Sequence, residues 1–187
     1  MEQNQQNNFQ RSAFIIGGLF GLIYFVITVI NDYLIINMEA EANPIFNPTF
    51  IGSVFICLLT ISGGITGVWF YAKQTDNPLT MGSGAGLGAL IGFVLIVVTI
   101  LLEYSWFLMN PDFYDQKLHS IIEMYENSEL PDQYKQMLID QTNSSLKNKF
   151  TLTGIFGQLL SGSFTALLNA LTAMLGVKLF INQPDEF

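Results

Sequence analysis

Four long stretches without a single charged residue constrain this chain more than any other feature of its sequence. They are 20, 31, 26 and 28 residues long and together hold 105 of the 187 residues. All 22 charged side chains therefore lie in the remaining 82 residues, at a density typical of soluble proteins. A helix of about 20 apolar residues crosses the hydrocarbon core of a bilayer. The pattern predicts a polytopic membrane protein and excludes a single soluble globular domain. The stretches are residues 12–31, 42–72, 77–102 and 150–177.

The uncharged stretches predict an all-α fold with four transmembrane helices. Each is too long for a strand, and backbone groups in lipid must form hydrogen bonds within their own segment. The expected spans are residues 13–33, 50–72, 79–102 and 150–177. The chain then divides into four parts. They are a polar cytoplasmic tail (1–12), helices one to three (13–102), an extracytoplasmic segment (103–149), and helix four with a short cytoplasmic tail (150–187).

Cations near the span ends indicate the orientation. The first loop, 32–47, carries three acids and no cation, whereas the two tails and the second loop carry Arg11, Lys178 and Lys73. Because positive charge favours the cytoplasmic side, we expect both termini in the cytoplasm. Lys147 and Lys149, just before the last span, are a counter-signal.

The segment between spans three and four predicts an amphipathic helical hairpin. It holds eight acids and four cations. Asn110-Pro111-Asp112 predicts the start of one helix, and Pro131-Asp132 the start of the next. A hairpin of this size cannot hold a core alone, so its apolar faces must meet each other, the membrane surface or a partner. The candidate partner-docking face has helical spacing: Tyr114, Leu118, Ile121, Ile122 and Tyr125.

Small residues recur at intervals of four in every predicted span. Such ridges allow the backbones of two membrane helices to approach closely. The glycines that begin span three lack the lysine and the preceding strand of a phosphate-binding loop, so we interpret them as a packing ridge too. The candidate packing positions are Gly17, Gly21, Gly63, Gly67, Gly84, Gly88, Gly92, Gly157, Ser161, Thr165 and Asn169.

The sequence carries no pattern typical of an enzyme. No nucleophile-and-base motif and no multi-ligand metal motif is present, and His119 has only Glu123 at helical spacing. We therefore expect no catalytic residue, no cofactor and no metal. The net charge of −8 would repel a phosphate backbone, which excludes nucleic acid as a partner.

Several short motifs resemble those of one known family. The chain is similar to the small bacterial membrane proteins grouped as domain of unknown function 4199, over most of its length. The resemblance implies a four-helix protein of a Gram-negative inner membrane with its hairpin in the periplasm. It implies no catalytic residue, because the family has no established activity. The longer and more acidic loop at 37–48 departs from the family. The motifs are Tyr71-Ala72-Lys73 with the turn through Asp76, Gly84 with Gly88, and Asn110-Pro111-Asp112-Phe113.

Two functions of different classes remain open. The first is a non-enzymatic accessory or structural subunit whose hairpin docks a membrane or periplasmic partner, or a second copy of the chain. It predicts that polar changes in the docking face abolish function, whereas Asp32 and Glu103 tolerate amides. These two acids are expected at the ends of spans, solvated near the headgroups. The second is a small oligomeric transporter or channel subunit for protons or ions, using Asp32, Glu103 and Asn169.

Overall fold

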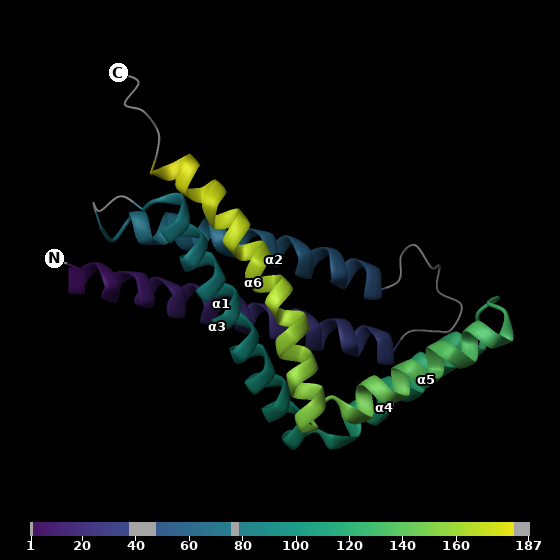
Figure 1. The fold of residues 1–187 in the computed structure, drawn as a ribbon. Helices are drawn as coiled ribbons and strands as arrows, with labels where there is room; N and C mark the ends of the chain where they lie inside the picture. The colour runs from purple at the N-terminus through teal and green to yellow at the C-terminus, as the bar shows by residue number, and fades with distance from the viewer. Residues whose placement is uncertain (1, 38–47, 76–78, 182–187) are drawn as a thin grey trace.

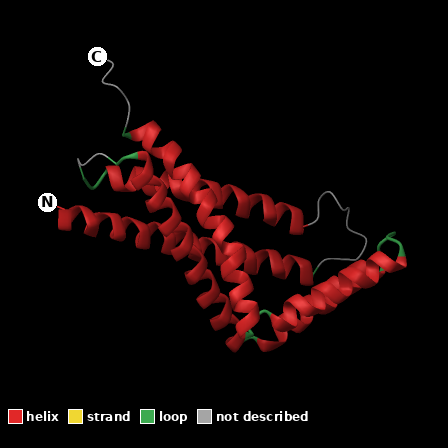
Figure 2. Ribbon diagram, in the orientation of Figure 1, coloured by secondary structure: helices red, strands yellow, loops and turns green. Residues whose placement is uncertain are grey.

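The computed structural model describes residues 2–37, 48–75 and 79–181, most of which are helical (Figure 1). Within these ranges no residue is in a strand, as Figure 2 shows. Four of the helices are long and apolar enough to cross a membrane, namely α1, α2, α3 and α6. The chain is therefore a polytopic helical membrane protein, as its uncharged stretches predict. The bounds are α1 Glu2–Ile36, α2 Pro48–Ala72, α3 Met81–Met109, α4 Pro111–Glu126, α5 Asp132–Asn148 and α6 Leu152–Phe180.

Two helices extend well beyond their predicted spans. The polar segment predicted as a tail continues α1 back to Glu2, and Phe9 within it packs against the core. Extending an existing helix adds one hydrogen bond for each residue fixed, so it costs little. At its other end α3 continues to Met109. A helix of 29 residues is about 43 Å long, against about 30 Å for a hydrocarbon core. The last turns of α3 therefore reach past the apolar layer, and they carry Glu103 with them.

The spans pack as two crossing pairs. α3 and α6 lie along each other, α1 packs against α3, and α2 packs against α6. In Figure 1, α3 and α6 run obliquely across α1 and α2. The hairpin of α4 and α5 leaves the lower end of α3 and α6 and returns toward the C-terminal end of α1, which α4 contacts. We call this side, where α1 and α3 end and α6 begins, the hairpin end.

The interior of the spans is apolar, and so is much of their outer surface. Leu87, Ile91 and Leu95 of α3 are at most 1% exposed and lie at the centre of the core. Large apolar side chains on the outside of the same helices, such as Leu101 and Leu160, remain exposed. A soluble protein rarely exposes so much apolar surface. This surface matches the lipid-facing side of a membrane bundle.

Glycines let the spans approach one another closely. At the predicted positions in α1, α2 and α3, a Cβ would lie within 3.0 Å of an atom of a neighbouring helix. At Gly88, for instance, it would collide with the backbone oxygen of Asn169 in α6. At Gly17 it would lie 2.8 Å from the backbone oxygen of Ile91. At Gly17, Gly21, Gly88 and Gly92 the close atoms include backbone, so a side chain there requires a helix to move, whereas at the other three sites the nearest atom belongs to a side chain. The predicted sites in these helices are Gly17, Gly21, Gly63, Gly67, Gly84, Gly88 and Gly92.

The predicted stripe on α6 is wrong in its first half. Gly157 and Ser161 are exposed, and a Cβ at Gly157 would meet nothing within 4 Å. Thr165 is half-buried, and only Asn169 is fully buried. The reason is geometric: each step of four residues turns about 40° around a helix, so 157 lies about 120° away from 169. The buried positions of α6 are Gly162, Asn169, Thr172, Ala173, Gly176 and Val177.

Candidate functional site where the hairpin meets the spans

A short ion pair joins the first helix of the hairpin to α1. Lys117 Nζ of α4 lies 2.6 Å from Asp32 Oδ1, near the C-terminus of α1. Asp32 is only 4% exposed, so water screens the pair little. One helical turn further along α4, Ser120 Oγ donates a hydrogen bond of 3.4 Å to the carbonyl oxygen of Ile36. Together these contacts hold the middle of α4 against the end of α1.

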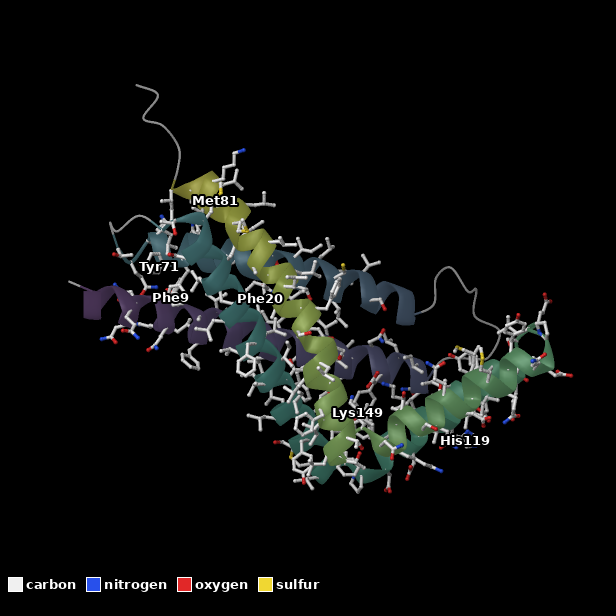
Figure 3. The ribbon with its side chains drawn as sticks, viewed as in Figure 1. Phe9, Phe20, Tyr71, Met81, His119 and Lys149 are labelled. Atoms are coloured by element: carbon white, nitrogen blue, oxygen red, sulfur yellow. The ribbon has the colours of Figure 1, made fainter. Side chains whose placement is uncertain are left out.

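A second ion pair joins the other end of the hairpin to α3. Lys149 Nζ, directly after α5, lies 2.9 Å from Glu103 Oε2. Glu103 is 7% exposed. Figure 3 shows Lys149 where the hairpin meets the spans. Two lysines of the hairpin segment thus form ion pairs with acids of two different spans, α1 and α3. We call Asp32, Glu103, Lys117 and Lys149 the clamp.

Aromatic side chains fill the junction around the clamp. Tyr114 is buried between the rings of Phe107 and Phe150, with centroid distances of 5.7 and 5.2 Å. Lys149 Nζ lies 5.4 Å from the centre of the Tyr114 ring, within range of a cation–π interaction. Burial raises the pKa of the Tyr114 phenol, and the carboxylates of Glu103 and Asp32 raise it further. The phenol therefore stays neutral, and both acids of the clamp lie close enough to affect it.

The link from α3 to α4 places this junction. Asn110 alone separates the two helices, and Pro111 begins α4 at a position where the missing N–H costs no helical bond. Phe113 in the first turn then packs edge-on against Tyr33 and Trp106, at 5.0 and 5.9 Å. The direction of α4 is therefore fixed by its first turn, which places Lys117 opposite Asp32.

The clamp corrects the expectation that Asp32 and Glu103 are solvated near the headgroups. Both are buried and paired, because the hairpin folds back over the ends of α1 and α3. Removing one partner of a buried pair leaves an uncompensated charge and is strongly destabilising, by about 3–5 kcal/mol in known cases. The expectation that these acids tolerate amides therefore loses its basis. Their first role is to hold the hairpin.

The predicted docking face of α4 is largely used within the chain. Tyr114 is buried at the junction, and the other four residues are half-buried. The physical reason is that α4 packs both on α5 and on α1, so its apolar side lies between them. An open apolar face is found instead on the other helix, α5. The four half-buried residues are Leu118, Ile121, Ile122 and Tyr125.

Asn169 lies far from the clamp along α6, at a crossing of three helices. It is 0% exposed, and Gly63 and Gly64 of α2 and Gly88 of α3 pack against it. Its Nδ2 donates to the carbonyl oxygen of Thr165 in its own helix at 2.9 Å. Its Oδ1 has no hydrogen-bond partner among the described residues. The amide therefore fills a close helix crossing rather than bridging two helices.

A cavity of about 310 Å³ lies between α1, α3 and α6, on the hairpin side of Asn169. Thr99 lines it and shares its one hydroxyl proton between the carbonyl oxygens of Leu95 and Gly21, at 2.9 and 3.3 Å. Neither acid of the clamp lines this cavity, nor does Asn169. The three predicted ion-pathway residues are therefore not brought together around it. Its polar lining is Tyr24, Thr99, Gln158, Ser161 and Thr165.

The one histidine of the chain lies on the exposed side of the hairpin. His119 Nδ1 is 3.5 Å from Glu123 Oε1, and both side chains are more than half exposed. In the part of the chain that the structure describes, no group of three or more His, Cys, Asp or Glu side chains could hold a metal ion.

The lysines of the clamp are the functional residues that sequence reasoning missed. Their partners are distant in the sequence, so helical spacing cannot pair them. One signal was present: Lys149 stands just before a span on the side where the positive-inside rule expects few cations. A lysine that breaks this rule near an acid at the end of a neighbouring span indicates a pair across the interface.

Comparison with known proteins agrees with this architecture. No curated protein and no solved structure matches the chain significantly. The family described as "Protein of unknown function (DUF4199)" matches residues 15–174, from the first span to the last. The clamp, the hairpin, α2 and α3 fall within these limits, which begin inside α1 and end inside α6. The acidic loop that departs from the resemblance, at 38–47, lies outside the described residues. The chain therefore belongs to the DUF4199 family.

Proposed function

We propose that this protein is a non-enzymatic accessory or structural subunit of a bacterial inner membrane. Both termini are cytoplasmic, and a periplasmic hairpin docks a protein partner. The observation that carries the proposal is an open apolar side on α5, presented by a hairpin that the clamp fixes to the spans.

The open side of α5 has the spacing of a helix that binds another helix or a groove. Tyr134 and Met137 lie at i and i+3 on α5 and are 58% and 54% exposed, and Leu130, 42% exposed, lies in the turn just before the helix. No residue of α5 is buried. Exposed apolar side chains on the spans face lipid, but the hairpin is too rich in charge to enter the hydrocarbon core. We call these three residues the α5 face.

The charge of the hairpin indicates the chemistry of the partner. From Pro111 to Asn148 the chain carries seven acids and three lysines, and Lys117 is already used against Asp32. Such a surface is repelled by anionic lipid headgroups. It suits a protein with a basic rim around an apolar centre, because complementary charge speeds encounter and selects among partners.

The clamp adds to affinity without touching the partner. A binding segment that is already held in place loses little conformational entropy on docking. Two buried ion pairs and the aromatic junction hold the hairpin before any partner arrives. We infer that the clamp prepares the α5 face for binding.

A pull-down from membranes tests the proposal. A full-length copy with a C-terminal tag is purified in mild detergent beside the Tyr134→Asp/Met137→Asp variant. A matched control, Gln133→Asp/Gln136→Asp, adds the same charge on the same exposed helix. We expect one basic protein at fixed stoichiometry with the wild type and the control, and a loss of at least tenfold with the α5-face variant. Equal recovery with all three proteins, or no co-purifying protein, would contradict the proposal.

A second candidate function, transport by an oligomer, is favoured by the cavity between α1, α3 and α6. Five polar side chains line it at membrane depth, where polar groups are costly. The clamp makes transport the less favoured function, because lysines neutralise the charges of Asp32 and Glu103. Purified protein in liposomes distinguishes the two functions. Flux of protons or alkali ions that Thr99→Val abolishes would favour transport, and the absence of flux would favour docking.

A further inference from the structure

A second cavity, of about 460 Å³, lies between the base of the hairpin and the ends of α3 and α6. It is separate from the cavity inside the spans and shares no lining residue with it. Its volume lies within the range of small-molecule sites. Both hairpin helices contribute to its lining, so it exists only while the hairpin is seated. It opens beside the clamp but does not include the four clamp residues.

Three aromatic rings form one wall of this cavity. Phe107 and Phe150 stack at 4.6 Å with an interplanar angle of 25°, and Tyr114 packs edge-on against Phe150. Leu118 and Leu146 add aliphatic surface. The wall stands where α3 leaves the apolar layer and α6 enters it, which is the depth of lipid headgroups and of aromatic belts. A ligand here can keep an apolar part in the membrane and a polar part at its surface.

Two opposite charges also line the cavity. Asp115 of α4 and Lys147 of α5 are both exposed, and neither forms an ion pair within the described residues. They stand on different helices of the hairpin. A ligand that carries one positive and one negative group would pair with both.

We propose that this cavity binds the zwitterionic headgroup of a phosphoethanolamine lipid. Lys147 pairs with the phosphate, Asp115 accepts hydrogen bonds from the ammonium group, and the glycerol and upper acyl chains lie along Phe107 and Phe150. A soluble phosphoethanolamine compound offers the same charges without the chains. The membrane is the favoured source because the aromatic wall lies at headgroup depth. This inference goes beyond the proposed docking function and does not depend on it.

Native mass spectrometry of the full-length protein in detergent tests the site. The probes are phosphatidylethanolamine, phosphatidylglycerol, which has the phosphate but no amine, and soluble glycerophosphoethanolamine. We expect one retained phosphatidylethanolamine, bound about tenfold more tightly than phosphatidylglycerol. Asp115→Asn should remove this preference, and Lys147→Gln should weaken both lipids. Glu129→Gln and Lys135→Gln, at the tip of the hairpin, are the matched controls and should change neither.

The variants test lipid binding directly, because Asp115 and Lys147 are exposed and their substitution should leave the fold intact. Equal binding of the two lipids, or wild-type binding by Asp115→Asn and Lys147→Gln, would overturn the site. Displacement of the lipid by an equal concentration of glycerophosphoethanolamine would overturn the membrane as the source. Unchanged melting temperatures of the variants show that any loss of lipid is a loss of binding.

Discussion

At the scale of single residues, two lysines decide how the hairpin is held. Lys117 and Lys149 are among only seven cations in the chain, and each is mostly buried against an acid of a span. An acid near the end of a span can be solvated or paired, and composition does not distinguish the two. The sequence alone therefore predicts the interfacial level of Asp32 and Glu103 but not their partners. Pairing depends on the direction of α4, which the first turn of that helix sets.

The clamp predicts strong coupling between Asp32 and Lys117. Asp32→Asn and Lys117→Met should each destabilise the protein by about 3 kcal/mol, because each leaves one buried charge unpaired. The double variant should lose less than the sum by at least about 1 kcal/mol. Denaturant unfolding in detergent micelles measures all three. Glu123→Gln is the control, since its exposed pair with His119 should contribute less than about 0.5 kcal/mol. Additive losses would show that the pair does not hold the hairpin.

At the scale of helices, the sequence predicts which segments cross the membrane better than which faces meet. Uncharged length identifies the four spans because a charge inside the hydrocarbon core is costly. Glycines of α1, α2 and α3 lie close to neighbouring helices, since a ridge of two or three turns stays on one face. On α6 the predicted ridge runs over four positions, 157 to 169, and the turn of the helix carries its first members out of the interface. On α4 the apolar residues do share one side of the helix, but α5 and α1 pack against that side.

A pair of glycine substitutions tests this account of α6. Gly88→Ala should destabilise the protein by about 1–3 kcal/mol, because its Cβ would collide with the backbone at Asn169. Gly157→Ala should be neutral or slightly stabilising, because its Cβ meets open space and alanine favours a helix. Thermal unfolding in detergent compares the two. A large loss at position 157 would show that it lies in an interface, such as one between copies of the chain.

At the scale of the whole molecule, the proposed orientation in the membrane rests on charge. The counter-signal at Lys149 has a physical explanation, because its charge is neutralised by Glu103. Lys147, the other lysine of the counter-signal, stays exposed. The cations near the other span ends, Arg11, Lys73 and Lys178, agree with cytoplasmic termini. The oblique crossing of α3 and α6 over α1 and α2 could not be predicted, and neither could the packing of the hairpin against α1. Both depend on contacts between segments that are distant in the sequence.

Cysteine labelling checks the orientation. In a Cys57→Ala background, Glu129→Cys at the tip of the hairpin should react with a membrane-impermeant maleimide in intact spheroplasts. Lys73→Cys, at the opposite end of the spans, should react only after lysis. Both positions are exposed, so a difference in labelling reports the side of the membrane. Labelling of position 73 and not of 129 in intact cells would reverse the topology.

Photo-crosslinking from the hairpin in living cells tests directly whether the α5 face docks a protein partner. A photoreactive phenylalanine analogue replaces Tyr134 or Met137 on the α5 face, and Phe156, exposed on a span, serves as the control. We expect one adduct with a distinct basic protein from positions 134 and 137, and no protein adduct from position 156. The adduct should be lost when the clamp variant Asp32→Asn/Glu103→Gln releases the hairpin. Adducts with lipid alone, or with a second copy of the chain alone, from the α5 face would contradict the docking of a distinct protein partner.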